Sequence, residues 1–76
     1  MNNKDQIDLL REKVRKLEHD ESLLFEILIN KNFFKINLNK CVNTIINIST
    51  YILRYNNAIT FLEDNPNSII DLKKIE

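Results

Sequence analysis

The chain has 76 residues, 11 basic and 11 acidic side chains, no glycine, one proline, one cysteine and one histidine. A single cysteine excludes an internal disulfide, and one cysteine with one histidine cannot supply a Cys/His zinc site within one chain. The absence of glycine argues against phosphate loops and tight β-hairpins, and the zero net charge argues against a duplex-binding surface.

The first predicted element is a long helix that begins after Asn3 and ends at the connection Asn30-Lys31-Asn32. Its apolar residues recur at alternating three- and four-residue steps, which places them on one stripe of a helix. The stripe consists of Ile7, Leu10, Val14, Leu17, Leu24 and Leu28. Asn3 is the expected N-cap, and Asp5 stands in the first turn, where the helix dipole favours a negative charge.

Glu21 occupies a position of this stripe where an apolar residue belongs. We consider three interpretations: a kink, a break after which Asp20 or Ser22 caps a second helix, or an exposed stretch beyond the end of the partner helix. After Ser22 the apolar residues of 23–25 and 27–29 surround most of the helix. This end of the helix should therefore be covered on more than one side.

Asn30-Lys31-Asn32 is the predicted connection, because asparagine tolerates left-handed geometry and can serve as a C-cap. The segment 33–39 alternates apolar and polar residues as a strand does. A single short strand has no pairing partner here. We interpret the segment as a turn in which Phe33 and Phe34 form an aromatic plug.

The second predicted helix runs from Leu38 to Glu63 and is apolar around more than the ~100° that a surface helix usually buries. One heptad-like seam consists of Leu38, Val42, Ile45, Ser49, Ile52, Asn56 and Ile59. A second stripe consists of Cys41, Ile48, Tyr55 and Leu62, and a third of Ile46 and Leu53. Asn56 is either a buried polar residue that fixes the helix register or a residue at the solvent-facing margin of the seam.

The segment 64–67 ends the second helix, because Asn65 precedes the only proline and is disfavoured in helical geometry. Ser68 is the predicted N-cap of a last short helix, with Asp71 in a short capping box. This helix contains Ile69, Ile70, Leu72 and Ile75. We expect it to fold back on the two long helices.

These elements predict an all-α fold: an antiparallel helical hairpin of two long, coiled-coil-like helices plus a short C-terminal helix, completed to a helical bundle by oligomerisation. We interpret residues 1–76 as a single helical domain. A domain this small usually needs a disulfide, a metal or oligomerisation for stability, and the composition leaves oligomerisation. No apolar run suits a membrane span or a signal peptide, so we expect a cytoplasmic location.

The apolar excess of the second helix predicts a protein partner. We expect a non-enzymatic protein–protein interaction module, such as an adaptor, an assembly subunit or an inhibitor. The partner is a second copy in a dimer or a different chain in a hetero-complex. The expected interface residues are Phe25, Ile29, Ile45, Ile48, Ile52, Tyr55 and Ile59. In the competing interpretation, the C-terminal helix and the aromatic plug cover the excess within a monomer.

Other classes of function have weaker signals. A small nucleic-acid-binding or regulatory protein would use the basic stretch Arg11–Lys16, and a membrane-surface protein would use the face of 45–53. His19 and its acidic neighbours do not converge on one point of a helix, and Cys41 on an apolar stripe behaves as a small hydrophobic residue. We therefore expect no catalytic residue, no metal site and no cofactor.

Overall fold

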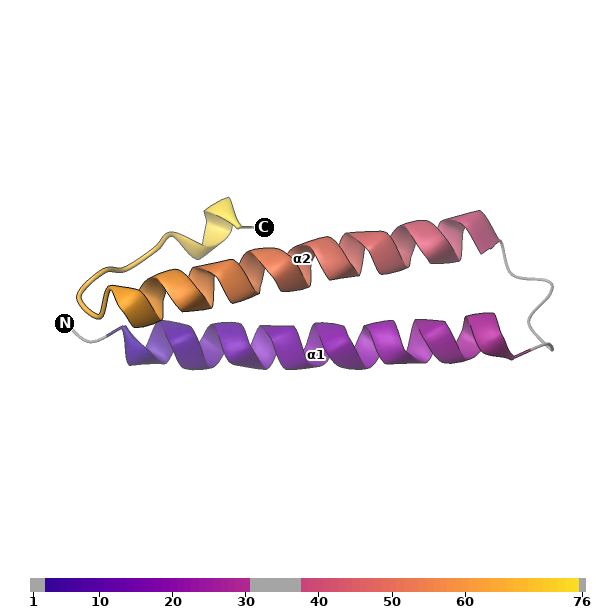
Figure 1. The fold of residues 1–76 in the computed structure, drawn as a ribbon, viewed down its shortest axis with the longest axis horizontal. Helices are drawn as coiled ribbons and strands as arrows, with labels where there is room; N and C mark the ends of the chain where they lie inside the picture. Colours follow the sequence, from indigo (N-terminus) through magenta and orange to yellow (C-terminus); the bar gives the residue numbers. More distant parts are fainter. Residues whose placement is uncertain (1–2, 31–37, 76) are drawn as a thin grey trace.

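The computed structural model describes residues 3–30 and 38–75. Two long helices, α1 (Lys4–Ile29) and α2 (Leu38–Asp64), lie side by side and run in opposite directions (Figure 1). A tail ending in the 3-10 turn η2 (Leu72–Lys74) folds back over the end of the hairpin where the chain begins and finishes. The predicted antiparallel helical hairpin is confirmed, and it forms a rod of 51 × 17 × 16 Å.

Helix α1 is continuous through Glu21, so the predicted alternative of a break at this residue is wrong. Its apolar stripe faces α2. Leu10 and Val14 are buried there, and Ile7 and Leu17 pack against the same cluster. The helix ends at Asn30, which has extended geometry (φ −78°, ψ 116°) rather than the expected left-handed one. The predicted aromatic plug of 33–34 lies outside the described residues.

The stripe of α2 that faces α1 differs from the predicted seam by one row of the helix. It consists of Cys41, Ile45, Ile48, Ile52, Tyr55, Ile59 and Leu62, all of them buried or half-buried. Val42, Ser49 and Asn56, which we had placed on the seam, are exposed. Asn56 therefore lies at the margin, as the second of its two interpretations held.

The chemistry of the two rows explains why the observed row of α2 faces α1 and the predicted row does not. Both share Ile45, Ile52 and Ile59, so heptad spacing alone does not separate them. The observed row adds large apolar groups to the core, Tyr55 and Leu62 among them. The predicted row would bury polar side chains such as Ser49 and Asn56, which costs free energy when they lack partners.

The polar interruption of the α1 stripe has a partner across the hairpin. The Ser49 hydroxyl donates a hydrogen bond to a carboxylate oxygen of Glu21. The two positions that break the apolar pattern thus meet each other at the edge of the helix–helix contact.

Replacing Glu21 with leucine should stabilise the hairpin by about 1 kcal/mol, roughly half the value of a fully buried leucine, because the position is half-buried. The urea midpoint of the helical circular dichroism signal measures this change. Ser49→Ala, which removes the hydrogen bond without adding apolar surface, should lower the midpoint slightly. A lower midpoint for Glu21→Leu would show that the polar pair outweighs apolar packing.

Asparagine amides cap the C-terminal end of α2 in a chain that has no glycine. The last carbonyls of a helix need donors from outside the helix, and glycine-based caps usually supply them. Here Asn65 Nδ2 donates to Phe61 O at 2.8 Å, and Asn3 Nδ2 donates to Leu62 O at 2.9 Å. Asn3 stands at the predicted N-cap position of α1, but its side chain makes no capping bond to α1.

The chain reverses after α2 in a β-turn with Pro66 at its second position, closed by the bond from Ser68 N to Asn65 O at 2.9 Å. The Gln6 side chain then binds the backbone of Ile70 twice: Nε2 donates to Ile70 O at 2.9 Å, and Oε1 accepts from Ile70 N at 3.1 Å. These bonds hold the tail against α1.

The prediction of a C-terminal helix capped by Ser68 is correct only for its last turn. Residues 68–71 are not helical, and η2 begins after Asp71, whose carboxylate accepts from Lys73 N at 3.0 Å. The bonds to Gln6 engage both backbone groups of Ile70 within this non-helical stretch. The apolar side chains Ile70, Leu72 and Ile75 do pack against the hairpin core, as expected.

Candidate functional site

The seven residues predicted as an interface fall into two groups. Ile45, Tyr55 and Ile59 are buried between the two helices, and Ile48 and Ile52 are half-buried on the same stripe. These five side chains serve the contact between α1 and α2. The other two, Phe25 and Ile29, are exposed on α1. A surface for a partner must therefore be built around exposed residues.

The hairpin has two flanks, one on each side of the plane that contains the axes of α1 and α2. The ion pair between Arg11 and Glu63 (3.4 Å) bridges α1 and α2 on one flank. The bonds from Gln6 to Ile70 place the tail on the other, which we call the tail flank. Positions seven residues apart share a stripe of a packed helix, so each flank can be followed along the rod from these markers.

The flank marked by Arg11 and Glu63 carries a row of exposed apolar side chains from both helices. Phe25 follows Arg11 by two heptads, and Val42 precedes Glu63 by three. Ile29 and Ile46 lie one helical turn after Phe25 and Val42, and Leu53 lies one heptad after Ile46. We call this surface the apolar flank: Phe25, Ile29, Val42, Ile46 and Leu53. Ile29 is 79% exposed, Leu53 60% and Ile46 56%.

The remaining large exposed apolar residues lie elsewhere. Leu23 precedes Phe25 by two residues, and Phe61 precedes Glu63 by two. Two residues turn an α-helix by about 200°, so both side chains point away from the apolar flank. Leu9 stands in the same relation to Arg11, and Ile69 belongs to the tail. The apolar flank is thus a surface to which both helices contribute exposed apolar side chains.

The middle of helix α2 carries a single charged residue. Between Cys41 and Leu62 its only charged residue is Arg54, whose guanidinium lies over the Tyr51 ring at 5.4 Å. Several of its polar groups are also satisfied within the helix. The hydroxyls of Thr44, Thr50 and Thr60 donate to the carbonyls four residues earlier. Covering these three hydroxyls would therefore not leave them without acceptors.

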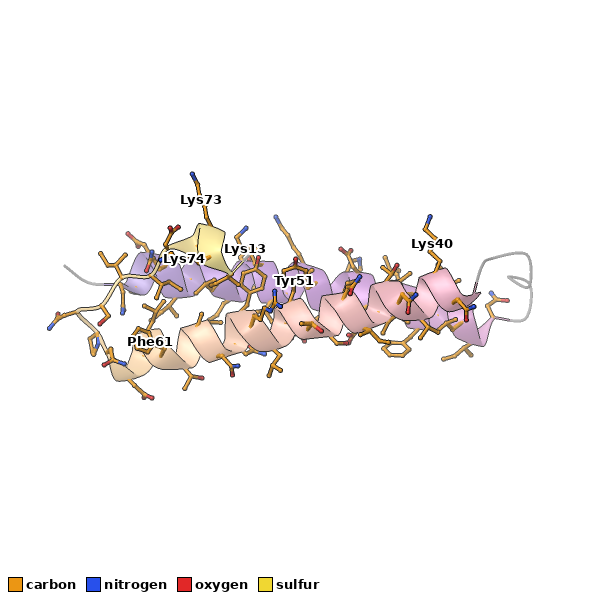
Figure 2. The ribbon with its side chains drawn as sticks, turned by 90° about the horizontal axis from the view of Figure 1, so that it is seen from above. Lys13, Lys40, Tyr51, Phe61, Lys73 and Lys74 are labelled. Atoms are coloured by element: carbon orange, nitrogen blue, oxygen red, sulfur yellow. The ribbon has the colours of Figure 1, made fainter. Side chains whose placement is uncertain are left out.

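The tail flank is richer in lysine. Figure 2 shows Lys73 and Lys74 projecting from the tail, on the side of the molecule where Lys13 lies. Lys13, Lys16, Leu17 and Tyr55 border a shallow, open depression of about 210 Å³. The Tyr51 and Tyr55 rings lie 6.4 Å apart between their centroids, and Tyr51 packs against the hairpin core.

Two of the basic side chains of the stretch Arg11–Lys16 have acidic partners. Arg11 pairs with Glu63 across the hairpin, and Arg15 pairs with Glu12 on its own helix at 3.6 Å. These pairs neutralise half of the basic residues that the alternative nucleic-acid function would use. Exposed ion pairs of this kind contribute little to stability, on the order of 0–1 kcal/mol.

The groups that carry chemistry in other proteins are dispersed here. His19 is exposed and borders an open depression of about 500 Å³ with Arg15, Lys16 and Asp20. Cys41 is a free thiol buried between the helices. Within residues 3–30 and 38–75, no three His, Cys, Asp or Glu side chains gather as metal ligands would. In the same ranges, neither helix combines the length and the hydropathy that crossing a membrane requires.

Val42, Ile46 and Leu53 are not among the expected interface residues: Val42 was predicted for the seam, and Ile46 and Leu53 for a separate stripe of the helix. A signal for them was present in the sequence, because the stretch from Cys41 to Leu53 has no charged residue on any face. A two-helix hairpin buries only one face of each helix, so some of these uncharged positions had to be exposed.

Comparisons with known proteins found no matching family model, no matching curated protein and no matching solved structure.

Proposed function

We propose that this chain acts by binding another protein chain through the apolar flank. The observation that supports the proposal most strongly is that both helices expose large apolar side chains on the apolar flank, which the tail does not cover. The tail packs Ile70, Leu72 and Ile75 onto one side of the hairpin. The other side leaves five large apolar side chains from two helices exposed to water.

The energetics favour a helical partner on this surface. Fully burying an isoleucine, leucine or phenylalanine side chain contributes roughly 1.5–3 kcal/mol, so the row offers several kcal/mol to a partner that covers it. The centres of protein interfaces are depleted of charged residues, as the outer surface of α2 is. A helix lying along the apolar flank would contact both α1 and α2, as in a helical bundle.

Replacing Ile46 with aspartate tests the proposal, since it places a charge at the centre of the apolar flank. The tagged chain is purified under native conditions from cells that make it, and light scattering gives the molar mass of the particle. We expect the wild-type particle to exceed the 9.1 kDa of one chain. The Ile46→Asp particle should lose the partner, which must then bind the purified wild-type chain directly.

Leu23→Asp is the matched control, because it makes the same change of charge at an exposed apolar residue that points away from the apolar flank. This variant should keep the mass of the wild-type particle. A wild-type particle with the mass of one chain would contradict the proposed function. So would an equal loss of the partner from both variants.

A further inference from the structure

We infer that the partner on the apolar flank is a second copy of the same chain, so that two hairpins form a four-helix bundle around a two-fold axis parallel to the helices. This inference rests on the proposed function and names its partner. In this arrangement α1 of one copy lies on α2 of the other. The connections of both hairpins lie at the same end of the bundle.

Charge is the first reason to favour a second copy. The chain has a net charge of zero, so two copies approach without net repulsion. A two-fold interface brings identical surfaces together, and any charged group near the axis meets its own like charge. The α2 side of the apolar flank contains no charge from Val42 to Leu53. It also presents no ionic group that would select a partner of opposite charge.

The distribution of charge also selects the orientation of the axis. Helix α1 carries acidic residues beside its part of the apolar flank, including Glu18, Glu21 and Glu26. A two-fold axis across the rod would stack α1 on its own copy and oppose these carboxylates, which repel each other. An axis along the rod instead places this part of α1 on the stretch of the other copy's α2 from Cys41 to Leu53, which has no charged residue. The acidic residues then meet no acidic residues.

The position of the row along the rod agrees with this axis. The apolar flank extends from Leu53 toward the connection, where Ile29 and Val42 lie, and so occupies one half of the rod. Two copies with their connections at the same end bring these apolar halves fully into contact. Two copies with their connections at opposite ends could bring these apolar halves into contact only if the rods were offset along their length. The tail of each copy lies on its outer side and does not obstruct the contact.

The purified chain alone tests the inference. Sedimentation equilibrium should show a concentration-dependent equilibrium between the 9.1 kDa chain and twice that mass. Ile46→Asp should weaken dimerisation at least ~100-fold, as expected for a charge at the centre of an interface. Leu23→Asp should not weaken it. Far-ultraviolet circular dichroism of dilute samples checks that both variants keep the helix content of the wild-type monomer.

Spin labels test the orientation of the axis. The label is attached to the variant Asn67→Cys in a Cys41→Ala background, because Asn67 is exposed at the end of the rod far from the connection. Parallel rods should place the two labels within about 30 Å, since helix axes in a bundle lie roughly 10 Å apart. Labels farther apart than one rod length of 51 Å would overturn the arrangement.

The outcomes separate this inference from the proposed function. A purified wild-type chain that stays monomeric at millimolar concentration overturns self-association. If the native particle is nevertheless heavier and depends on Ile46, the proposed function holds with a different partner. If the purified chain dimerises equally well with Ile46→Asp, the second copy does not bind through the apolar flank, and the inference is wrong.

Discussion

Replacing Leu10 with alanine should remove much of the stability of the hairpin. Leu10 is fully buried, in the cluster that also contains Val14, Tyr55 and Leu62. Removing a buried leucine side chain costs about 2–5 kcal/mol, because apolar contacts are lost and a cavity remains. A domain of 76 residues has on the order of 4–11 kcal/mol in total. We expect the melting temperature of the helical signal to fall by more than about 10 °C.

Leu9 offers a matched control one residue away on the same helix. Its side chain is exposed, and surface substitutions usually change stability by less than ~0.5 kcal/mol. Leu9→Ala should therefore melt close to the wild type at the same protein concentration. Equal losses for the two variants would show that α1 does not present Leu10 to α2.

Replacing Asn3 with aspartate should release the C-terminal tail. The Asn3 amide is buried, and Nδ2 lies 2.9 Å from each of three carbonyl oxygens, those of Leu62, Asn65 and Ser68. A carboxylate of the same shape has no hydrogen to donate, and its charge faces the negative ends of three dipoles. We expect a loss of about 2–3 kcal/mol, near the upper range for leaving buried polar groups without partners.

Hydrogen exchange locates this effect. The amide hydrogens of Ser68 and Ile70 should exchange faster in Asn3→Asp. In the wild type, Ser68 N donates to Asn65 O and Ile70 N donates to Gln6 Oε1, and both bonds depend on the tail staying in place. Asn57→Ala, at an exposed asparagine of α2, should leave them unchanged. If the amides of the tail remain protected in Asn3→Asp, the three bonds from Asn3 are not what holds the tail.

The sequence predicts the helices of this protein well. The predicted end of α2 at Glu63 lies one residue from the observed end at Asp64, because the proline at position 66 is a strong local signal. The stripe of α1 is also correct, since its opposite face is heavily charged and only one row is apolar. Fold class and helix direction follow from two such helices joined by a short connection.

Tertiary contacts decide the features that sequence analysis missed. Helix α2 has several apolar rows, and only packing against α1 selects the row that contains Tyr55 and Leu62. Asn3 resembles an ordinary N-cap, but its side chain binds carbonyls 59 to 65 residues away. No local pattern reveals such partners. The same holds for Gln6, whose side chain binds the backbone of Ile70, 64 residues away.

The protection of the apolar flank inside the native particle is the most direct test of the proposed function. The variants Ile46→Cys and Leu23→Cys each place one new thiol at an exposed position, while the buried Cys41 serves as an internal reference in both. Mass spectrometry measures the rate at which each thiol reacts with an alkylating reagent. We expect the thiol at position 46 to react at least about tenfold more slowly than the thiol at position 23 in the native particle, and at a similar rate once the particle is dissociated. Equal rates in the native particle would contradict the proposal that a protein chain covers the apolar flank.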